Sequence, residues 1–88
     1  ERGQETVGVQ RFLVKGRVQR WPSRSEDKDA LLRWIITESI AESERLAESE
    51  LNDRIRRYTE DPALVRRYGV DFGMLRRDPA TQIYYLSQ

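Results

Sequence analysis

Residues 61–73 read DPALVRRYGVDFG and carry the clearest helix signals in the sequence. Asp61 is a good N-cap, because its carboxylate can accept a hydrogen bond from a free backbone N–H group at the helix start. Pro62 fits the first helical position, where the N–H that proline lacks would have no partner. Gly73 suits the left-handed conformation that often ends a helix. Together these signals predict a helix from residue 62 to residue 72.

The segments on either side of this helix complete a recognisable order. Residues 74–77 and 82–86 are two short β-prone runs around the turn DPAT, and they predict a hairpin with its proline in the loop. On the N-terminal side, Leu51, Ile55 and Tyr58 recur at i, i+4 and i+7, which predicts a helix beginning near Glu48. Two helices joined by a short turn and followed by a β-ribbon make a winged helix-turn-helix.

An earlier helix is predicted from residue 23 to about residue 40. Ser23 and Glu26 have the spacing of a capping box. The hydrophobic phase changes between Leu31 and Leu51, so a break is expected near residues 41–47. The apolar face of this helix is broader than one core contact requires. We therefore expect one row of it to contact a protein partner or a second copy of the chain, and that row consists of Leu32, Ile36 and Ile40.

The N-terminal region leaves two structures open. Residues 9–14 and 17–21 are β-prone runs around Lys15-Gly16 and predict a hairpin, while a short helix over residues 6–14 is the alternative. Residues 1–8 show no period and are interpreted as a flexible arm. The predicted fold is α+β and mostly helical. It is a single winged-helix-like domain over residues 9–88, with a C-terminal β-wing and an N-terminal hairpin or short helix.

The composition of the 88 residues excludes several kinds of site. The chain has no cysteine and no histidine, so it cannot form disulfides, thiolate or imidazole zinc sites, or Ser–His triads. The acidic residues of the middle segment do not match a calcium loop. No apolar run is long enough to span a bilayer. We expect a cytoplasmic binding domain without cofactor, metal, membrane contact or enzymatic activity.

The net charge of +1 hides an uneven distribution along the chain. Residues 1–25 carry six Lys/Arg and two Asp/Glu, residues 26–50 carry three and eight, and residues 51–88 carry seven and five. Fourteen of the sixteen basic residues are arginine, which makes bidentate contacts with phosphate and guanine. The two basic ends are therefore candidates for contact with a polyanion, whereas the acidic middle is not.

Several motifs, in this order along the chain, resemble one prokaryotic family of domains of unknown function, family 2087. The most specific are Trp21-Pro22-Ser23 and the string from Arg66-Arg67 to Val70-Asp71-Phe72-Gly73, and the likeness covers residues 9–86. The resemblance implies a winged-helix-like domain associated with transcriptional regulators, and it implies no established biochemical activity. Three features depart from the family pattern. After Trp21-Pro22-Ser23 the family usually has a basic cluster, whereas this chain has Arg24-Ser25-Glu26-Asp27-Lys28-Asp29, which weakens the case for phosphate binding at that helix start. Ala47 stands where a capping hydroxyl is expected, and Gly69 stands where an apolar residue is expected. We expect Gly69 to admit the close approach of another backbone.

The sequence is compatible with two functions. The first is binding of duplex DNA, because in a winged helix the third helix can enter the major groove while the wing reaches the flanking backbone. The predicted contacts are the arginines of that helix, of the wing and of the second helix: Arg66, Arg67, Arg76, Arg77, Arg56 and Arg57. Arg11, Arg17, Arg20 and Arg24 form a separate basic cluster near the N-terminal hairpin. The second function is protein interaction or sensing without DNA.

Overall fold

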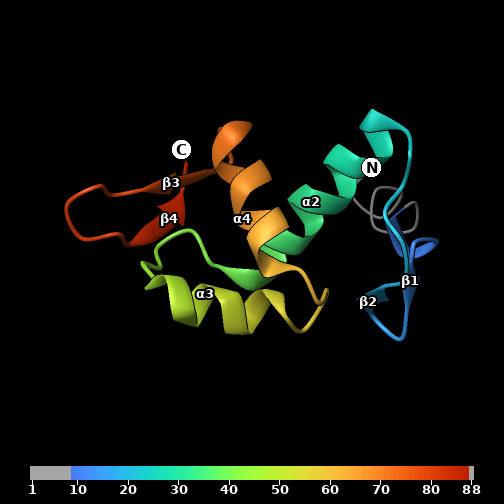
Figure 1. Cartoon of the computed structure of the whole chain (residues 1–88), viewed down its shortest axis with the longest axis horizontal. Coiled ribbons are helices and arrows are strands. Elements are labelled where there is room, and N and C mark those ends of the chain that lie inside the picture. The colour runs from blue at the N-terminus through green and yellow to red at the C-terminus, as the bar shows by residue number, and fades with distance from the viewer. Residues whose placement is uncertain (1–8, 88) are drawn as a thin grey trace.

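The computed structural model describes residues 9–87, and the predicted N-terminal arm lies outside them. The chain forms three helices and two small antiparallel hairpins in this range, so the α+β class is confirmed. The elements follow the order β1 (Leu13–Val14), β2 (Arg17–Val18), α2 (Ser25–Ser39), α3 (Glu48–Ile55), α4 (Pro62–Asp71), β3 (Leu75–Arg77) and β4 (Tyr84–Leu86). The β1–β2 hairpin and the β3–β4 hairpin lie at opposite ends of the molecule, with the helices between them (Figure 1).

The β3–β4 hairpin, which we call the wing, is joined to the helices by a third short strand contact. β3 and β4 pair antiparallel, with Leu75 opposite Leu86. Leu46 precedes α3 and forms a bridge to Tyr84, with backbone hydrogen bonds of 2.9 and 2.8 Å in the two directions. A helix, a short strand, two further helices and a hairpin paired with that strand are consistent with a winged-helix-like layout.

The end signals of α4 are confirmed. The Asp61 carboxylate accepts a hydrogen bond from the backbone N–H of Leu64 at 3.2 Å, and Pro62 occupies the first turn. Gly73 follows the helix with a φ of 80°, which is the left-handed conformation expected of it. Gly69 does admit a close approach, but by side chains rather than by a backbone. A Cβ at this position would lie 2.8 Å from Leu75 Cδ1 and 2.9 Å from Ile36 Cδ1.

The start of α2 differs from the prediction. The helix begins at Ser25, its N-cap is Arg24, and no side chain caps it. The predicted capping box of Ser23 and Glu26 is therefore wrong, because the chain turns helical two residues after that serine. At α3 the predicted start near Glu48 is confirmed. The helix lacks a capping hydroxyl at Ala47, and the Glu50 carboxylate accepts the Ala47 N–H at 3.0 Å instead.

The broad apolar face of α2 lies inside the domain. Leu32, Ile36 and Ile40 are 0%, 2% and 1% exposed, so the prediction that they form a partner or dimer face is wrong. The physical reason is the position of α2, which contacts both α3 and α4 and therefore buries two rows of side chains in the chain's own core. Figure 1 shows α2 passing behind α4 with α3 below it.

In the N-terminal segment the hairpin is confirmed over residues 13–18, whereas Val9 and Gln10, which were predicted to begin its first strand, are helical; residues 6–8 of the alternative helix lie outside the described residues. Leu13 pairs with Val18 and Val14 with Arg17, which leaves Lys15-Gly16 as a two-residue turn. Both turn residues have positive φ, 54° and 79°, the combination that a tight type I′ hairpin turn requires. The hairpin is docked on the end of α3 by a hydrogen bond of 2.6 Å from the Val18 N–H to the Tyr58 carbonyl.

The loop between α2 and α3 is held by one ion pair. Arg54 donates to the Glu44 carboxylate at 2.6 Å and to the Ser39 carbonyl at 3.2 Å. Glu50 lies one helical turn before Arg54 but forms no ion pair with it, because the Glu50 carboxylate accepts a hydrogen bond at the N-cap of α3. The Arg54 hydrogen bond, and then the hydrogen bond from the Ala41 N–H, hold the pKa of Glu44 below its usual range.

This pKa shift gives a pH prediction. A carboxyl whose pKa is lower in the folded protein contributes stability above its unfolded pKa and loses it as the pH falls through the folded pKa. We expect Glu44→Gln to lower the free energy of unfolding near pH 7, and we expect the difference from wild type to vanish in strong acid. Urea unfolding at several pH values between 7 and 2.5 measures it, with the exposed neighbour Glu42→Gln as the control. A difference that persists at the lowest pH would contradict the assignment.

Candidate nucleic-acid interface

The outward face of α4 is fixed by the residues that the helix buries. Pro62, Val65 and Gly69 are buried against the core. At about 100° per residue, Arg67 lies about 200° from Val65 and therefore faces away from the core. Arg67 is exposed, and among residues 9–87 no ion pair involves it; Asp71, one helical turn further along α4, does not pair with it.

Arg66 does not share that face. Its side chain is 17% exposed, and its Nε donates to Asn52 Oδ1 at 2.6 Å. Its Nη1 donates to the Tyr84 hydroxyl at 3.1 Å and lies 3.5 Å from Glu48 Oε1. One guanidinium thus connects α4 to α3 and to the wing. The prediction that Arg66 stands outward to touch DNA is wrong, because this side of α4 packs against both neighbours.

The different environments of Arg66 and Arg67 follow from their angular positions around α4 relative to the buried Val65. Arg66 lies about 100° from Val65, at the border of the buried stripe, whereas Arg67 lies on its far side. A long arginine at such a border can bury its stem and reach a polar partner. Its partners could not be named from the sequence, because Asn52 and Tyr84 are brought to it only by the packing of α3 and the wing.

The wing presents two arginines to solvent. Arg76 and Arg77 are both exposed, although alternation along a strand predicts that only one of them points outward. The reason is that β3 buries only its first residue, Leu75, and then leaves the body of the domain. The loop beyond it is ordered by Asp78, whose backbone carbonyl accepts from Gln82 at 2.6 Å and whose carboxylate accepts from Ala80 at 2.9 Å.

A further arginine at the wing was missed by sequence reasoning. The Arg45 guanidinium lies over the Tyr85 ring, 4.3 Å from its centroid. Arg45 and Arg76 line the same surface hollow of about 480 Å³, together with Tyr85 and the carboxylates of Glu42 and Glu44. Nothing in the local pattern relates Arg45 to the wing, because the two are joined through the bridge between Leu46 and Tyr84.

Arg56 and Arg57 lie elsewhere. They are exposed residues that follow α3, at the end that carries the N-terminal hairpin. Arg56 pairs with Asp53 at 3.0 Å, and its backbone carbonyl accepts a hydrogen bond from the Arg17 guanidinium. The six predicted contacts therefore divide into three groups: Arg67, Arg76 and Arg77 on α4 and the adjoining wing, Arg56 and Arg57 beside the hairpin, and Arg66 between the elements.

Within the described range, no group of three or more acidic residues is arranged to hold a metal ion. None of the helices described is long and apolar enough to cross a membrane.

The fold and the exposed arginines define a small α+β domain in which a helix and the β-hairpin packed against it each present exposed basic side chains. The chain belongs to DUF2087, a family described as uncharacterized proteins conserved in bacteria, which matches residues 17–86. The match includes β2, all three helices and the wing, and β1 precedes it. No curated protein and no solved structure matches the chain.

Proposed function

We propose that the protein is a DNA-binding domain associated with transcription, built as a winged helix, in which α4 faces the major groove and the wing contacts the flanking backbone. The observation that carries the proposal is the exposed Arg67 on the outward face of α4, next to a wing with exposed Arg76 and Arg77. The role is one of binding, without catalysis. Bacterial DNA lies in the cytoplasm, where the proposal places the protein.

The chemistry of these side chains suits a duplex. A guanidinium on the outward face of a recognition helix can donate two hydrogen bonds to guanine O6 and N7, or bind a phosphate. Arginines on a β-ribbon beside it contact phosphates and fix the register of the helix. Arg45, held over Tyr85, adds a cation that is already ordered before binding, which lowers the entropic cost of the contact.

The test is a titration of duplex DNA across a salt series, followed by fluorescence anisotropy. Each phosphate contact contributes about −0.9 to the slope of log K against log salt. We expect the variant Arg67→Ala/Arg76→Ala/Arg77→Ala to flatten that slope by about 2 to 3. Arg33→Ala, an exposed arginine of α2 paired with Asp29, is the matched control and leaves the slope nearly unchanged. A triple variant that binds with the wild-type slope would remove α4 and the wing from the interface.

A second candidate is protein interaction, and a different surface favours it. The predicted partner face of α2 is buried, but a hollow of about 1080 Å³ lies between the other side of α2 and the start of β3. Its apolar lining consists of Trp34, Met74, Leu86 and Phe72, and Phe72 is 53% exposed. Glu38 and Glu42 also line it. Carboxylates repel phosphate, so this surface suits an apolar polypeptide segment carrying Lys or Arg.

Light scattering after size exclusion, together with the DNA titration, separates the two candidates. A dimer that Phe72→Ser dissociates, in a protein with no affinity for DNA, would favour protein interaction. A monomer that binds duplex DNA with a steep salt dependence favours the first candidate.

A further inference from the structure

The most positive segment of the described chain is not α4 or the wing but the N-terminal hairpin together with the irregular residues 19–24 that follow it. Residues 9–24 contain five Lys/Arg and no Asp/Glu, whereas residues 61–86 contain four Lys/Arg and three Asp. We propose that this segment is a second phosphate-binding element, which contacts the DNA backbone on the side of α4 opposite to the wing. The inference rests on the proposed DNA-binding function.

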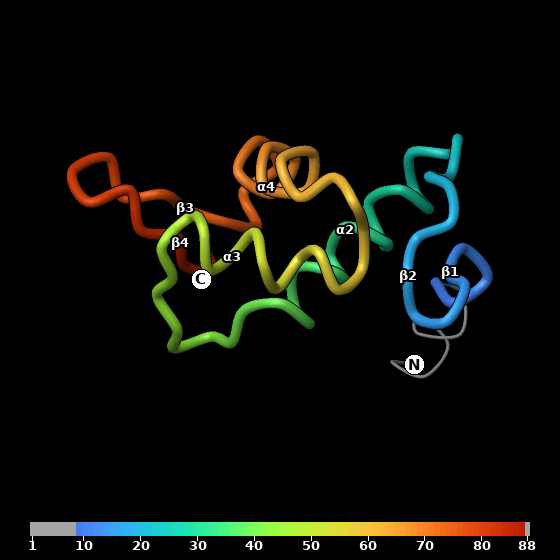
Figure 2. The backbone as a smooth tube through the Cα atoms, turned by 60° about the horizontal axis from the view of Figure 1, so that its bottom comes forward, coloured from blue at the N-terminus to red at the C-terminus, as the bar shows by residue number. Residues whose placement is uncertain are grey.

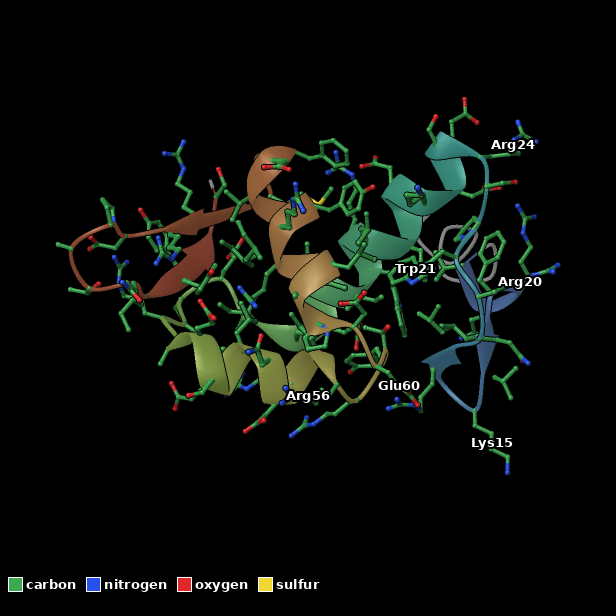
Figure 3. The ribbon with its side chains drawn as sticks, in the orientation of Figure 1. Lys15, Arg20, Trp21, Arg24, Arg56 and Glu60 are labelled. Carbon is green, nitrogen blue, oxygen red and sulfur yellow. The ribbon has the colours of Figure 1, made fainter. Side chains whose placement is uncertain are left out.

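The cations of this segment point away from the domain. In Figure 3, Lys15 lies at the tip of the hairpin, and Arg20 and Arg24 follow along the outer edge toward the start of α2. All three are exposed. Among the described residues, no ion pair involves Lys15 or Arg20, and Arg24 lies 3.7 Å from a carboxylate oxygen of Glu26, which is itself exposed. Such an exposed ion pair contributes little stabilising free energy, so the Arg24 guanidinium remains able to bind a phosphate.

The remaining two arginines of the segment attach it to the domain. Arg11 pairs with Asp27 of α2 at 3.1 Å, and Arg17 donates to the backbone carbonyl of Arg56. With the hydrogen bond from the Val18 N–H to Tyr58, these contacts hold the hairpin against α2 and the end of α3. A charged element that is already positioned loses little conformational freedom on binding, and its electrostatic attraction is therefore retained as affinity.

The dimensions of the molecule match the two sides of one helical turn of DNA. The wing and the hairpin lie at opposite ends of the longest axis with α4 between them, and the view in Figure 2 shows the same order from another side. The longest extent is 38 Å, and one turn of duplex is about 34 Å. A helix seated in the major groove would thus have basic side chains at both flanking backbones.

Arg56 and Arg57 strengthen the same end of the molecule. They are exposed where α3 meets the hairpin, and Figure 3 shows Arg56 on the lower edge between the two. Glu60 is the acidic residue labelled near Arg56 in the same view, and at the other end of the outer edge the exposed Glu26 of α2 follows Arg24. The predicted contacts on α3 therefore belong with the hairpin, rather than with the wing.

The experiment compares two triple variants that remove the same charge. The first is Lys15→Ala/Arg20→Ala/Arg24→Ala in the hairpin segment, and the second is the α4 and wing variant described above. Both are titrated with a 20-base-pair duplex between 50 and 200 mM salt, and circular dichroism confirms that each is folded. If six phosphates are contacted, the affinity of the wild-type protein for DNA should fall about 10³-fold over this range. Each triple variant keeps three of these contacts, so its affinity should fall only about 40-fold.

The outcomes separate this inference from the proposed function. Flattened salt dependence in both triple variants supports it. A hairpin variant that binds like wild type, while the α4 and wing variant is weakened, overturns the hairpin element and leaves the proposed function standing. If the hairpin variant loses affinity for DNA and the α4 and wing variant does not, the proposed recognition face is wrong. The placement of the hairpin beside that face is then wrong as well. Absence of any DNA binding by the wild-type protein overturns both.

Discussion

Replacing Arg66 by alanine is expected to lower the free energy of unfolding by about 2 to 3 kcal/mol, an effect on folding rather than on DNA contact. The substitution removes hydrogen bonds to Asn52 Oδ1 and the Tyr84 hydroxyl and leaves both acceptors partly buried. It also removes the ionic neighbour of Glu48, whose contribution is discounted because that side chain is 45% exposed. Urea unfolding followed by circular dichroism measures the change.

Arg67→Ala is the matched control, one residue further along the same helix. Arg67 is exposed, so its removal should change the free energy of unfolding by no more than about 0.5 kcal/mol. Arg66→Lys should fall between the two, because an ammonium keeps the charge but cannot reproduce the planar fork of donors. Equal stability of the Arg66 and Arg67 variants would mean that Arg66 does not connect α4 to α3 and the wing.

These neighbouring arginines show what the sequence can and cannot resolve. Local signals placed α4 closely, because the Asp61 cap, the proline of the first turn and Gly73 act within a few residues of each other. The same holds for the start of α3, whereas the Lys15-Gly16 turn was one of two alternatives that the sequence left open. The function of a side chain at the border of the buried stripe depends on which elements pack beside it. That information is spread over residues 46–84 and has no local pattern.

The candidate interface was predictable to a similar extent. The arginines of α4 and the wing were identified from their elements, and one of them, Arg66, was assigned to the wrong environment. Arg45 was missed because a single strand bridge carries it to the wing. The grouping of Arg56 with the N-terminal hairpin was missed because a contact between side chain and backbone connects segments 39 residues apart.

A second large effect is expected from Leu32→Ala, which tests whether this row of α2 is core or a partner surface. Leu32 is 0% exposed, and truncating a buried leucine typically costs 2 to 5 kcal/mol through lost burial and the cavity that remains. We expect a loss of about 3 kcal/mol. For a domain of this size, that corresponds to a fall in Tm of more than about 10 °C. Thermal unfolding followed by circular dichroism measures it.

Val70→Ala is the control for Leu32→Ala, because it removes the methyl groups of an aliphatic side chain that is 41% exposed on α4. Its effect on Tm should be a small fraction of the effect at Leu32, since most of the removed surface was already in contact with water. The two interpretations of the α2 row predict different observations. A partner surface would lose self-association on truncation while the monomer melted as before, whereas a core position lowers the Tm of the monomer itself at every protein concentration. Because α2 packs against both α3 and α4, the second outcome is the one that its packing requires.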